Sequence, residues 1–292
     1  MRFLILGHSG QLGKEICMAL ESSEHKFELL DYRRCELDSS EKLSQQLKLL
    51  DFDVFVNAVA WTDVDAAESH VKETFRINAF WPRNLAKALL NIEKTFIHIS
   101  TDYVFSGESN IPWQVDSEPS PINVYGESKA KAEEFIQQIN PYQSYIFRTS
   151  WLYSPFRKNF VKTMIKSALK DDCNLKVVDD QIGQPTSAKD LAIQIIKSIE
   201  ENIKPGIYHA TNSGEASWNS FARKIFTLIG ENPDRIESIS SDDVKRIAKR
   251  PIYSVLSHDC WIDSDIKPMK NWQLALEEQI NIIKSAVLME GI

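Results

Sequence analysis

The chain begins Met1-Arg2-Phe3-Leu4-Ile5-Leu6-Gly7-His8-Ser9-Gly10-Gln11-Leu12-Gly13, and this stretch decides the fold. Its first apolar residues form a short run of the kind that a buried parallel strand shows. The glycines then follow the spacing G-x-x-G-x-x-G, and residues 14–20 continue with helical periodicity. A strand, a glycine-rich turn and a helix in this order predict a dinucleotide-binding site formed by Gly7, Gly10, Gln11, Leu12 and Gly13. The glycines let the backbone approach a pyrophosphate at the amino terminus of the helix.

A second predicted strand, Phe27–Asp31, ends in an acid. Asp31 is typical of an acid that binds a ribose hydroxyl of the cofactor, which favours NAD. Arg33 and Arg34 follow at once and are suited to a 2′-phosphate, which favours NADPH. The two signals conflict, so we expect either use of both cofactors or a preference for NADPH. A plain turn with solvated arginines is the alternative interpretation.

Strand and helix patterns alternate to about residue 150 and predict an α/β fold with a Rossmann-type doubly wound parallel sheet. The chain continues without a clean linker, so we predict a smaller α/β substrate-binding lobe interleaved with the first. The expected division is an NAD(P)-binding domain in 1–150, with a return segment near 187–210, and a mainly substrate-binding lobe in 151–292. The expected strands are Phe3–Leu6, Phe27–Asp31, Asp53–Ala60, Thr95–Ser100, Ser144–Ser150, Leu175–Asp179, Gly206–Ala210 and Arg235–Ser240. The expected helices are Lys14–Leu20, Ser39–Leu50, Ala66–Leu90 with a bend at Pro82, Asn159–Lys170, Ser187–Glu200, Trp218–Ile229 and Trp272–Leu288.

The composition excludes several classes of protein. The chain has 292 residues, is 43% hydrophobic and 26% charged, and has a net charge of -7 with no run of lysine or arginine. Nucleic acid is therefore not an expected partner. No apolar run approaches the ~18 residues of a membrane span, and no signal peptide precedes the first strand. The separated cysteines Cys17, Cys35, Cys173 and Cys260 are expected to be reduced thiols, which indicates a cytoplasmic protein.

Tyr125 and Lys129 stand four residues apart and share one face if their segment is helical. An ammonium beside a phenol favours the phenolate, so we expect Lys129 to lower the Tyr125 pKa from about 10. Tyr125 is then a proton donor near neutral pH. The pattern alone is weak, because Y-x-x-x-K occurs by chance in many solvated helices. Thr101 follows a predicted strand at the edge where α/β sheets bind ligands, whereas His98 inside that strand is expected to be a core histidine.

Seven segments together resemble, in order, the dTDP-4-dehydrorhamnose reductase family of the extended short-chain dehydrogenase/reductases. They are G-H-S-G-Q-L-G (7–13), V-N-A-V-A-W-T-D-V-D-A-A-E (56–68), S-T-D-Y-V-F-S-G (100–107), P-I-N-V-Y-G-E-S-K (121–129), R-T-S-W-L-Y (148–153), D-Q-I-G-Q-P-T (180–186) and R-P-I-Y-S (250–254). The resemblance covers the whole chain. It implies reduction of the 4-keto group of a dTDP-4-dehydro-6-deoxysugar by NADPH, or by NADH, with dTDP-4-dehydro-L-rhamnose as the nearest substrate.

The same resemblance implies roles for individual residues. It assigns Thr101, Tyr125 and Lys129 to a catalytic triad. Beyond the glycine loop it assigns the cofactor site to Asp31, Asp38, Ala60, Trp61 and Thr62. It assigns the substrate site to Thr101, Asp102, Trp151 and Arg250, the last of them near the nucleotide diphosphate. Trp61 stands where the family has a smaller residue or a histidine, and this leaves the exact sugar open.

Several alternatives stay open at this point. Related dehydratases carry Thr-Asp-Glu where this chain has Thr101-Asp102-Tyr103, so elimination lacks its base and simple reduction is favoured. A reductase of another nucleotide 4-ketosugar and a non-catalytic NADP-binding regulatory subunit remain the other hypotheses. Trp151 and Tyr153 either cover the substrate or pack in the core. Some relatives are metal-bridged dimers, which leaves a homodimer open, but no carboxylate cluster demands such a bridge and we predict no metal.

Overall fold

The computed structural model describes residues 1–170, 174–262 and 264–291 of the chain. Within these residues the main sheet is parallel, with the strand order β10-β5-β4-β3-β1-β2. This confirms the predicted α/β fold with a parallel sheet at its centre. The strands are β1 (Arg2–Leu6), β2 (Lys26–Leu30), β3 (Val54–Asn57), β4 (Thr95–Thr101), β5 (Ser144–Thr149) and β10 (Gly206–His209).

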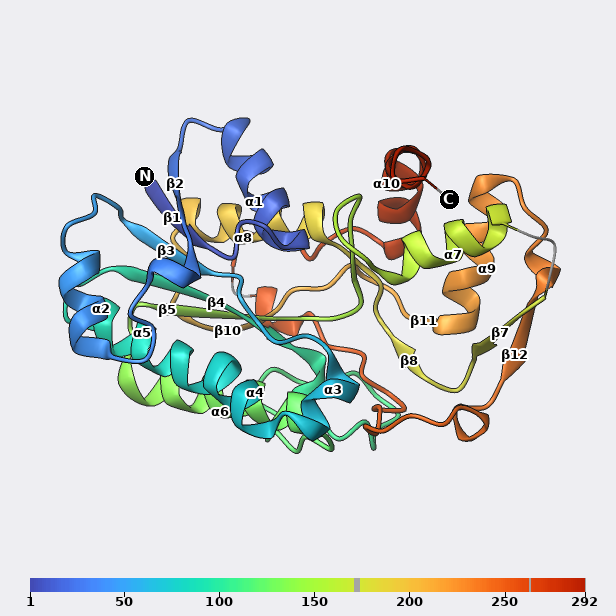
Figure 1. Cartoon of the computed structure of the whole chain (residues 1–292), viewed down its shortest axis with the longest axis horizontal. Coiled ribbons are helices and arrows are strands. Elements are labelled where there is room, and N and C mark those ends of the chain that lie inside the picture. Colours follow the sequence, from blue (N-terminus) through green and yellow to red (C-terminus); the bar gives the residue numbers. More distant parts are fainter. Residues whose placement is uncertain (171–173, 263, 292) are drawn as a thin grey trace.

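Helices cover both faces of this sheet (Figure 1). The two faces carry separate apolar cores because side chains alternate along each strand. In β1, Phe3 and Ile5 pack with α1 and α8, whereas Leu4 and Leu6 pack with α2, α5 and α6. All four side chains are buried, which explains the continuous apolar run in the sequence. The helices are α1 (Gln11–Glu21), α8 (Ala188–Glu200), α2 (Ser40–Leu47), α5 (Trp81–Leu90) and α6 (Val124–Ile139).

A crevice is expected where neighbouring strands send their helices to opposite faces. Strand β1 lies between β2 and β3. Helix α1, which follows β1, packs on one face, whereas α2, which precedes β3, packs on the other. The carboxyl ends of β1 and β3 therefore mark the switch point of the sheet, and the site lies there.

The segment predicted as one long helix from Ala66 to Leu90 is broken into several pieces. It consists of α3 (Val64–Ser69), α4 (Val71–Phe75), a π-helical turn (Arg76–Phe80) and α5. The π-helical turn directly precedes α5, whose second residue is Pro82. We expected a bend there, because the proline ring crowds the preceding turn and removes a hydrogen bond. The break at His70 was not predicted, and there the histidine Nδ1 lies 2.9 Å from the Ala66 carbonyl oxygen.

A second group of helices packs beyond the carboxyl-terminal edge of the sheet, on the right of Figure 1. Its apolar core joins α7, α9 and α10. Between α7 and α9 the chain returns to the main sheet through α8 and β10. The helices of this lobe are α7 (Phe160–Lys170), α9 (Trp218–Ile229) and α10 (Trp272–Met289). Its short strands are β6 (Leu152–Tyr153), β7 (Leu175–Val178), β8 (Ile182–Gly183), β9 (Thr186–Ser187), β11 (Ala216–Ser217) and β12 (Ile236–Ile239).

Two further expectations concern the described residues only. No helix there is both long enough and apolar enough to cross a bilayer. Cys17, Cys35 and Cys260 are free thiols. The fourth cysteine, Cys173, lies outside the described residues.

Candidate active site

A cleft of about 700 Å³ opens at the carboxyl ends of the central strands, where the switch point of the sheet predicts a ligand site. Both lobes contribute to its wall. The sheet side supplies Gly10, Gln11, Leu12, Ala58, Val59, Ala60, Thr62, Val64, Ile99, Ser100, Thr101, Asp102, Tyr103, Tyr125, Lys129, Thr149 and Ser150. The remainder is supplied by Trp151, Leu152, Arg157, Lys158, Asn159 and Trp218.

The glycine loop forms one end of this cleft. Gly7 has a left-handed backbone with φ of 92°, and a Cβ on Gly13 would lie 2.2 Å from the Gly7 carbonyl oxygen. Helix α1 can therefore begin directly against the loop only because both positions are glycine. Its N-cap, Gly10, offers no side chain to the first-turn N–H groups, and that turn carries no acid. Such a helix terminus is suited to a bound anion.

The three residues predicted to be catalytic all line the cleft. Thr101 ends β4, and its hydroxyl accepts a hydrogen bond from the Tyr103 backbone N–H at 3.2 Å. Helix α6 begins at Val124, after Asn123 caps it by accepting from the Gly126 N–H at 2.8 Å. Tyr125 is thus in the first turn of α6, and Lys129 follows on the same face one turn later.

The expected effect of Lys129 on the Tyr125 pKa is wrong. Burial raises the pKa of Tyr125 to about 12, and the nearby Thr101 hydroxyl only partly opposes this shift. Burial also lowers the pKa of Lys129 to about 7. A lysine that readily loses its charge stabilises a phenolate weakly, and the sequence pattern could not show how deeply both groups are buried.

Lys129 is anchored from the neighbouring strand. Its Nζ donates to the Ile99 carbonyl oxygen at 2.5 Å and lies 3.1 Å from His98 Nε2. His98 is buried, as expected of a core histidine, and burial holds its pKa well below 6.5. Its contact with Lys129 was not predicted, because His98 is in a strand and Lys129 in a helix, and no sequence pattern pairs the two residues.

Asp102 lies beside Thr101, whose hydroxyl donates to Asp102 Oδ1 at 3.0 Å. The side chain is 2% exposed, and burial raises its pKa to about 7. Tyr103, at the position of the dehydratase glutamate, packs edge-on against the Tyr125 ring with centroids 5.9 Å apart. Burial thus shifts the pKa of Asp102 towards its uncharged form, as it does for Tyr125.

Two stacked tryptophans line the far side of the cleft. The rings of Trp151 and Trp218 are nearly parallel, with centroids 3.5 Å apart. Trp151 has an uncommon positive φ of 45°, and Gly183 leaves room for its indole, since a Cβ there would lie 2.6 Å from the ring. Tyr153 is instead buried in the core of the second lobe, so the core-packing interpretation holds for it.

Two polar residues of the second lobe, Arg157 and Asn159, contact the glycine loop. Arg157 Nε donates to the Ser9 carbonyl oxygen at 2.8 Å, and Asn159 Nδ2 donates to Gln11 Oε1 at 2.9 Å. Arg157 and Lys158 are exposed at the rim of the cleft. This group was not predicted. Its only signal in the sequence is the run Arg-Lys-Asn at 157–159, which lies between a proline and the helix 160–170.

Asp31 and Arg33 lie just beyond β2, next to the end of β1, and not in the wall of the cleft. Asp31 accepts two close hydrogen bonds from the guanidinium, at 3.0 Å and 2.9 Å, and Arg33 holds the pKa of that carboxyl below its usual value. The acid and the base that gave conflicting cofactor signals are therefore partners of each other.

Three other predicted positions are engaged away from the wall of the cleft. Asp38 accepts from Arg76 at 2.6 Å and from the Trp81 indole at 2.9 Å. The Trp61 indole donates to the Asp63 carbonyl oxygen at 2.9 Å. Its neighbours Ala60 and Thr62 line the cleft, whereas Trp61 does not.

Arg250 is the third of these positions. It pairs with Asp65 of α3 at 2.8 Å and is not among the residues that line the cleft. The guanidinium therefore already has a carboxylate partner where we expected it to face the diphosphate.

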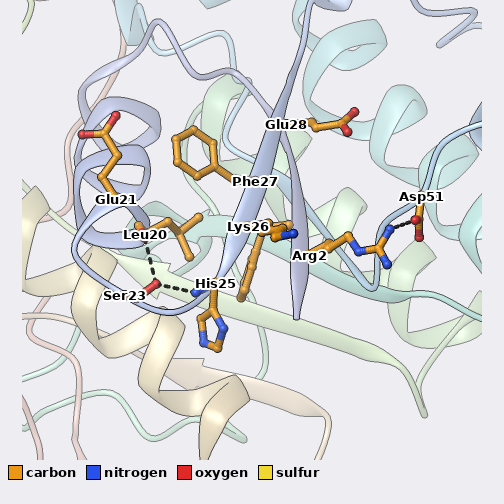
Figure 2. A pocket seen from close by; sticks show the side chains of 10 residues that line it. Arg2, Leu20, Glu21, Ser23, His25, Lys26, Phe27, Glu28 and Asp51 are labelled. Carbon is orange, nitrogen blue, oxygen red and sulfur yellow. Dashed lines mark hydrogen bonds and ion pairs between the residues drawn. The ribbon is translucent and has the colours of Figure 1, made fainter.

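A second hollow, of about 600 Å³, lies at the amino ends of the strands, opposite the first cleft (Figure 2). It is formed where β1 and β2 begin, whereas ligands of such sheets bind where strands end. Two of its lining side chains have charged partners, Arg2 with Asp51 and His25 with Glu200. We therefore place the functional site in the first cleft.

Comparison with known proteins shows the family of the chain. The model of the RmlD substrate binding domain family matches residues 1–285. A dTDP-4-dehydrorhamnose reductase of Streptomyces griseus is 36% identical over 95% of this chain and 92% of its own length. A dTDP-4-keto-6-deoxy-D-glucose reductase of Streptomyces niveus is 33% identical over 97% of this chain and 98% of its own. The structure of dTDP-4-dehydrorhamnose reductase from Bacillus anthracis, in complex with NADP, has a TM-score of 0.91 at 33% identity, covering 96% of this chain and 99% of that one.

Proposed function

Because the chain belongs to the RmlD substrate binding domain family, we propose that it is an NADPH-dependent reductase of a dTDP-4-dehydro-6-deoxysugar. The observation that carries this proposal is the meeting of Thr101, Tyr125 and Lys129 in one cleft with the glycine loop. A regulatory subunit on the same fold has no need for these three groups in that arrangement.

The residues of the cleft fit a dinucleotide. The uncapped start of α1, with Gly10 as its N-cap, is suited to the pyrophosphate. Asp31 and Arg33 lie at the adjacent strand end, where the adenosine ribose of such a cofactor is expected. The guanidinium is largely exposed and suits a 2′-phosphate, which supports NADPH as the preferred cofactor and leaves NADH as a weaker one. The Bacillus anthracis relative with NADP supports the same choice.

The bound cofactor supplies the hydride, and the protein controls the oxygen of the substrate. As the ketone is reduced, negative charge develops on its oxygen. Tyr125, protonated at neutral pH, donates its proton there. The Thr101 hydroxyl turns its one hydrogen from Asp102 Oδ1 to the same substrate oxygen. Lys129, anchored on Ile99, is placed to hold the ribose next to the reacting ring.

The surroundings of Tyr125 support reduction over elimination. A dehydratase needs a further base beside the tyrosine. Tyr103 occupies that position here, and burial keeps its pKa above 10, so it does not act as a base near neutral pH.

We further propose dTDP-4-dehydro-L-rhamnose as the substrate, reduced to dTDP-L-rhamnose. The Streptomyces griseus relative supports this sugar, whereas the Streptomyces niveus relative supports the 4-keto-6-deoxyglucose isomer as the second candidate. The stacked pair of Trp151 and Trp218 offers an apolar wall for either sugar or for the thymine.

The proposal is tested by NADPH oxidation with a panel of dTDP-, CDP- and GDP-linked 4-ketosugars, with the product configuration read by NMR. We expect turnover with the dTDP-linked sugars and dTDP-L-rhamnose as the favoured product. Tight NADPH binding without turnover of any 4-ketosugar would instead indicate the regulatory subunit.

A further inference from the structure

A buried chain of hydrogen bonds connects the end of β3 to Lys129. The Val59 backbone N–H donates to Asn57 Oδ1 at 3.1 Å. Asn57 Nδ2 lies 3.2 Å from His98 Nδ1, and His98 Nε2 lies 3.1 Å from Lys129 Nζ. Asn57, His98 and Lys129 are each at most 2% exposed, so water does not replace any of these bonds.

The hydrogen bond from Val59 to Asn57 fixes which group donates and which accepts in each of the later hydrogen bonds. A backbone N–H is always a donor, so the Asn57 oxygen must face Val59 and its NH₂ must face His98. His98 Nδ1 is then an acceptor, and the proton of the neutral ring resides on Nε2. That N–H points at Lys129 Nζ, which can accept a hydrogen bond only as a neutral amine. The amine still donates one of its own hydrogens to the Ile99 carbonyl oxygen.

We propose that Asn57 and His98 are positioning residues that fix the protonation state of Lys129, holding it as a neutral amine that accepts a hydrogen bond from His98 Nε2–H. A charged Lys129 would need the opposite ring tautomer. That tautomer would set the Nδ1–H of His98 against the NH₂ of Asn57, or would turn the amide and leave the Val59 N–H without its acceptor. This inference deepens the proposed function and rests on the role given there to Lys129.

The charges around Lys129 agree with a neutral amine. Glu133 lies one turn further along α6 and favours the charged lysine, but Arg148 of β5 binds its carboxylate through bonds of 2.7 Å, 3.0 Å and 3.1 Å. Ser100 of β4 donates to the same carboxylate. Tyr125 on α6 and Asp102 after β4 have raised pKa values, which leaves Lys129 without a strong counter-charge.

This arrangement gives Lys129 a use that an ordinary lysine lacks. Burial brings its pKa to about 7, so it exchanges protons readily near neutral pH. Each turnover removes a proton from Tyr125, and a lysine of this kind is matched to the return of that proton from solvent. His98 is the group through which the protein sets the protonation state of Lys129.

The first test is the tautomer of His98 in the unmodified protein. Nitrogen-15 NMR distinguishes the two neutral forms of each ring, and the His98 signals are assigned by their loss in His98→Gln. We expect the Nε2–H form above the Lys129 midpoint, at about pH 8 to 9, where the amine is neutral and His98, with a pKa well below 6.5, is uncharged. The Nδ1–H form, or a charged ring, in that pH range would overturn the proposal.

The second test reverses the donor and acceptor roles along these hydrogen bonds with an isosteric substitution. In Asn57→Asp the carboxylate accepts from both Val59 and His98, which moves the ring proton to Nδ1 and turns Nε2 towards a charged lysine. Carbon-13 NMR of labelled lysine, with Lys129 assigned by its loss in Lys129→Met, should show a midpoint near 7 in the unmodified protein and a rise of at least about one pH unit in the variant.

Asn140→Asp is the matched control for the added acid. Asn140 is equally buried, at the far end of α6, and its Nδ2 has no partner to lose. We expect neither the His98 tautomer nor the Lys129 midpoint to move in it. A Lys129 midpoint that is unchanged in Asn57→Asp, or that rises as much in Asn140→Asp, would refute the proposal that Asn57 and His98 set the protonation state of Lys129. None of these measurements uses turnover, so they are independent of whether the proposed sugar is reduced.

Discussion

Removal of a single hydroxyl, in Tyr125→Phe, is the sharpest test of the proposed chemistry. The ring of Tyr125 packs edge-on against Tyr103, and a phenylalanine preserves this contact. The side chain begins a capped helix, and the cap is made by Asn123, so the backbone should be unchanged. The variant therefore isolates the proton donor.

The size of the effect follows from the donors in the cleft. Two hydroxyls, from Tyr125 and Thr101, are proposed to face the oxygen on which charge develops. Loss of one such donor costs about 3 kcal/mol in the transition state, which corresponds to roughly a 150-fold lower rate at 1.36 kcal/mol per tenfold. Loss of the proton donor adds to this, so turnover should fall at least about 100-fold. The affinity for NADPH should stay nearly unchanged, because the glycine loop is untouched.

The assay is single-turnover NADPH oxidation together with a fluorescence titration of NADPH. Tyr208→Phe serves as the control, since it removes a phenol of β10 that only donates to the Lys204 carbonyl oxygen. A Tyr125→Phe rate within about threefold of the unmodified rate would refute the assignment of Tyr125 as the proton donor. An equal loss of NADPH affinity would show that the hydroxyl acts in binding instead.

Four other changes probe the remaining parts of the site. Arg33→Ala removes a charge-assisted bond worth about 1.5–3 kcal/mol, so the preference for NADPH over NADH in kcat/KM should fall roughly 10- to 150-fold; an unchanged ratio would remove Arg33 from the 2′-phosphate site. Gly13→Ala places a Cβ 2.2 Å from a loop carbonyl, so NADPH affinity, followed by fluorescence, should fall at least about tenfold. Trp218→Leu removes the stack on Trp151, worth about 0.5–1.5 kcal/mol, and should raise KM for the sugar nucleotide roughly two- to tenfold with kcat largely kept. The folded-state pKa of Asp102 is raised from 3.8 to about 7, so its stabilising contribution is present below pH 3.8 and is lost as the pH rises through 7. Asp102→Asn should therefore raise the free energy of unfolding at pH 8 by up to about 4 kcal/mol and change it little at pH 4. Urea unfolding at the two pH values measures both effects.

The elements that the sequence predicted well are those whose signals are local. The apolar run before Gly7, the glycine spacing and the helix after it are contiguous, and each appears in the structure near its expected bounds. Helix α9 has the predicted bounds of Trp218 to Ile229, because Ser217 caps it and Gly230 ends it in the left-handed conformation. Local capping chemistry of this kind can be seen in the sequence.

What the sequence could not predict depends on residues far apart along the chain. Asn159 meets Gln11 across 148 positions, and no periodicity reports such a contact. Lys129 lies on a helix and His98 on a strand, and no spacing in the sequence indicates that the two residues meet. The Tyr125 pKa was predicted in the wrong direction for the same reason, since burial is a property of the assembled cleft.

The charges of the cleft are divided between its rim and its interior. Arg157 and Lys158 stand exposed at the rim, where an anionic diphosphate can meet them in water. Inside, burial moves the pKa of Tyr125, of Lys129 and of Asp102 towards the uncharged form of each group. A buried site of this kind has a low effective dielectric, so a hydrogen bond to a developing oxyanion is stronger there than in water. The same burial that keeps the Tyr125 proton in place before reaction thus increases the stabilisation that this proton provides when the ketone oxygen becomes negative.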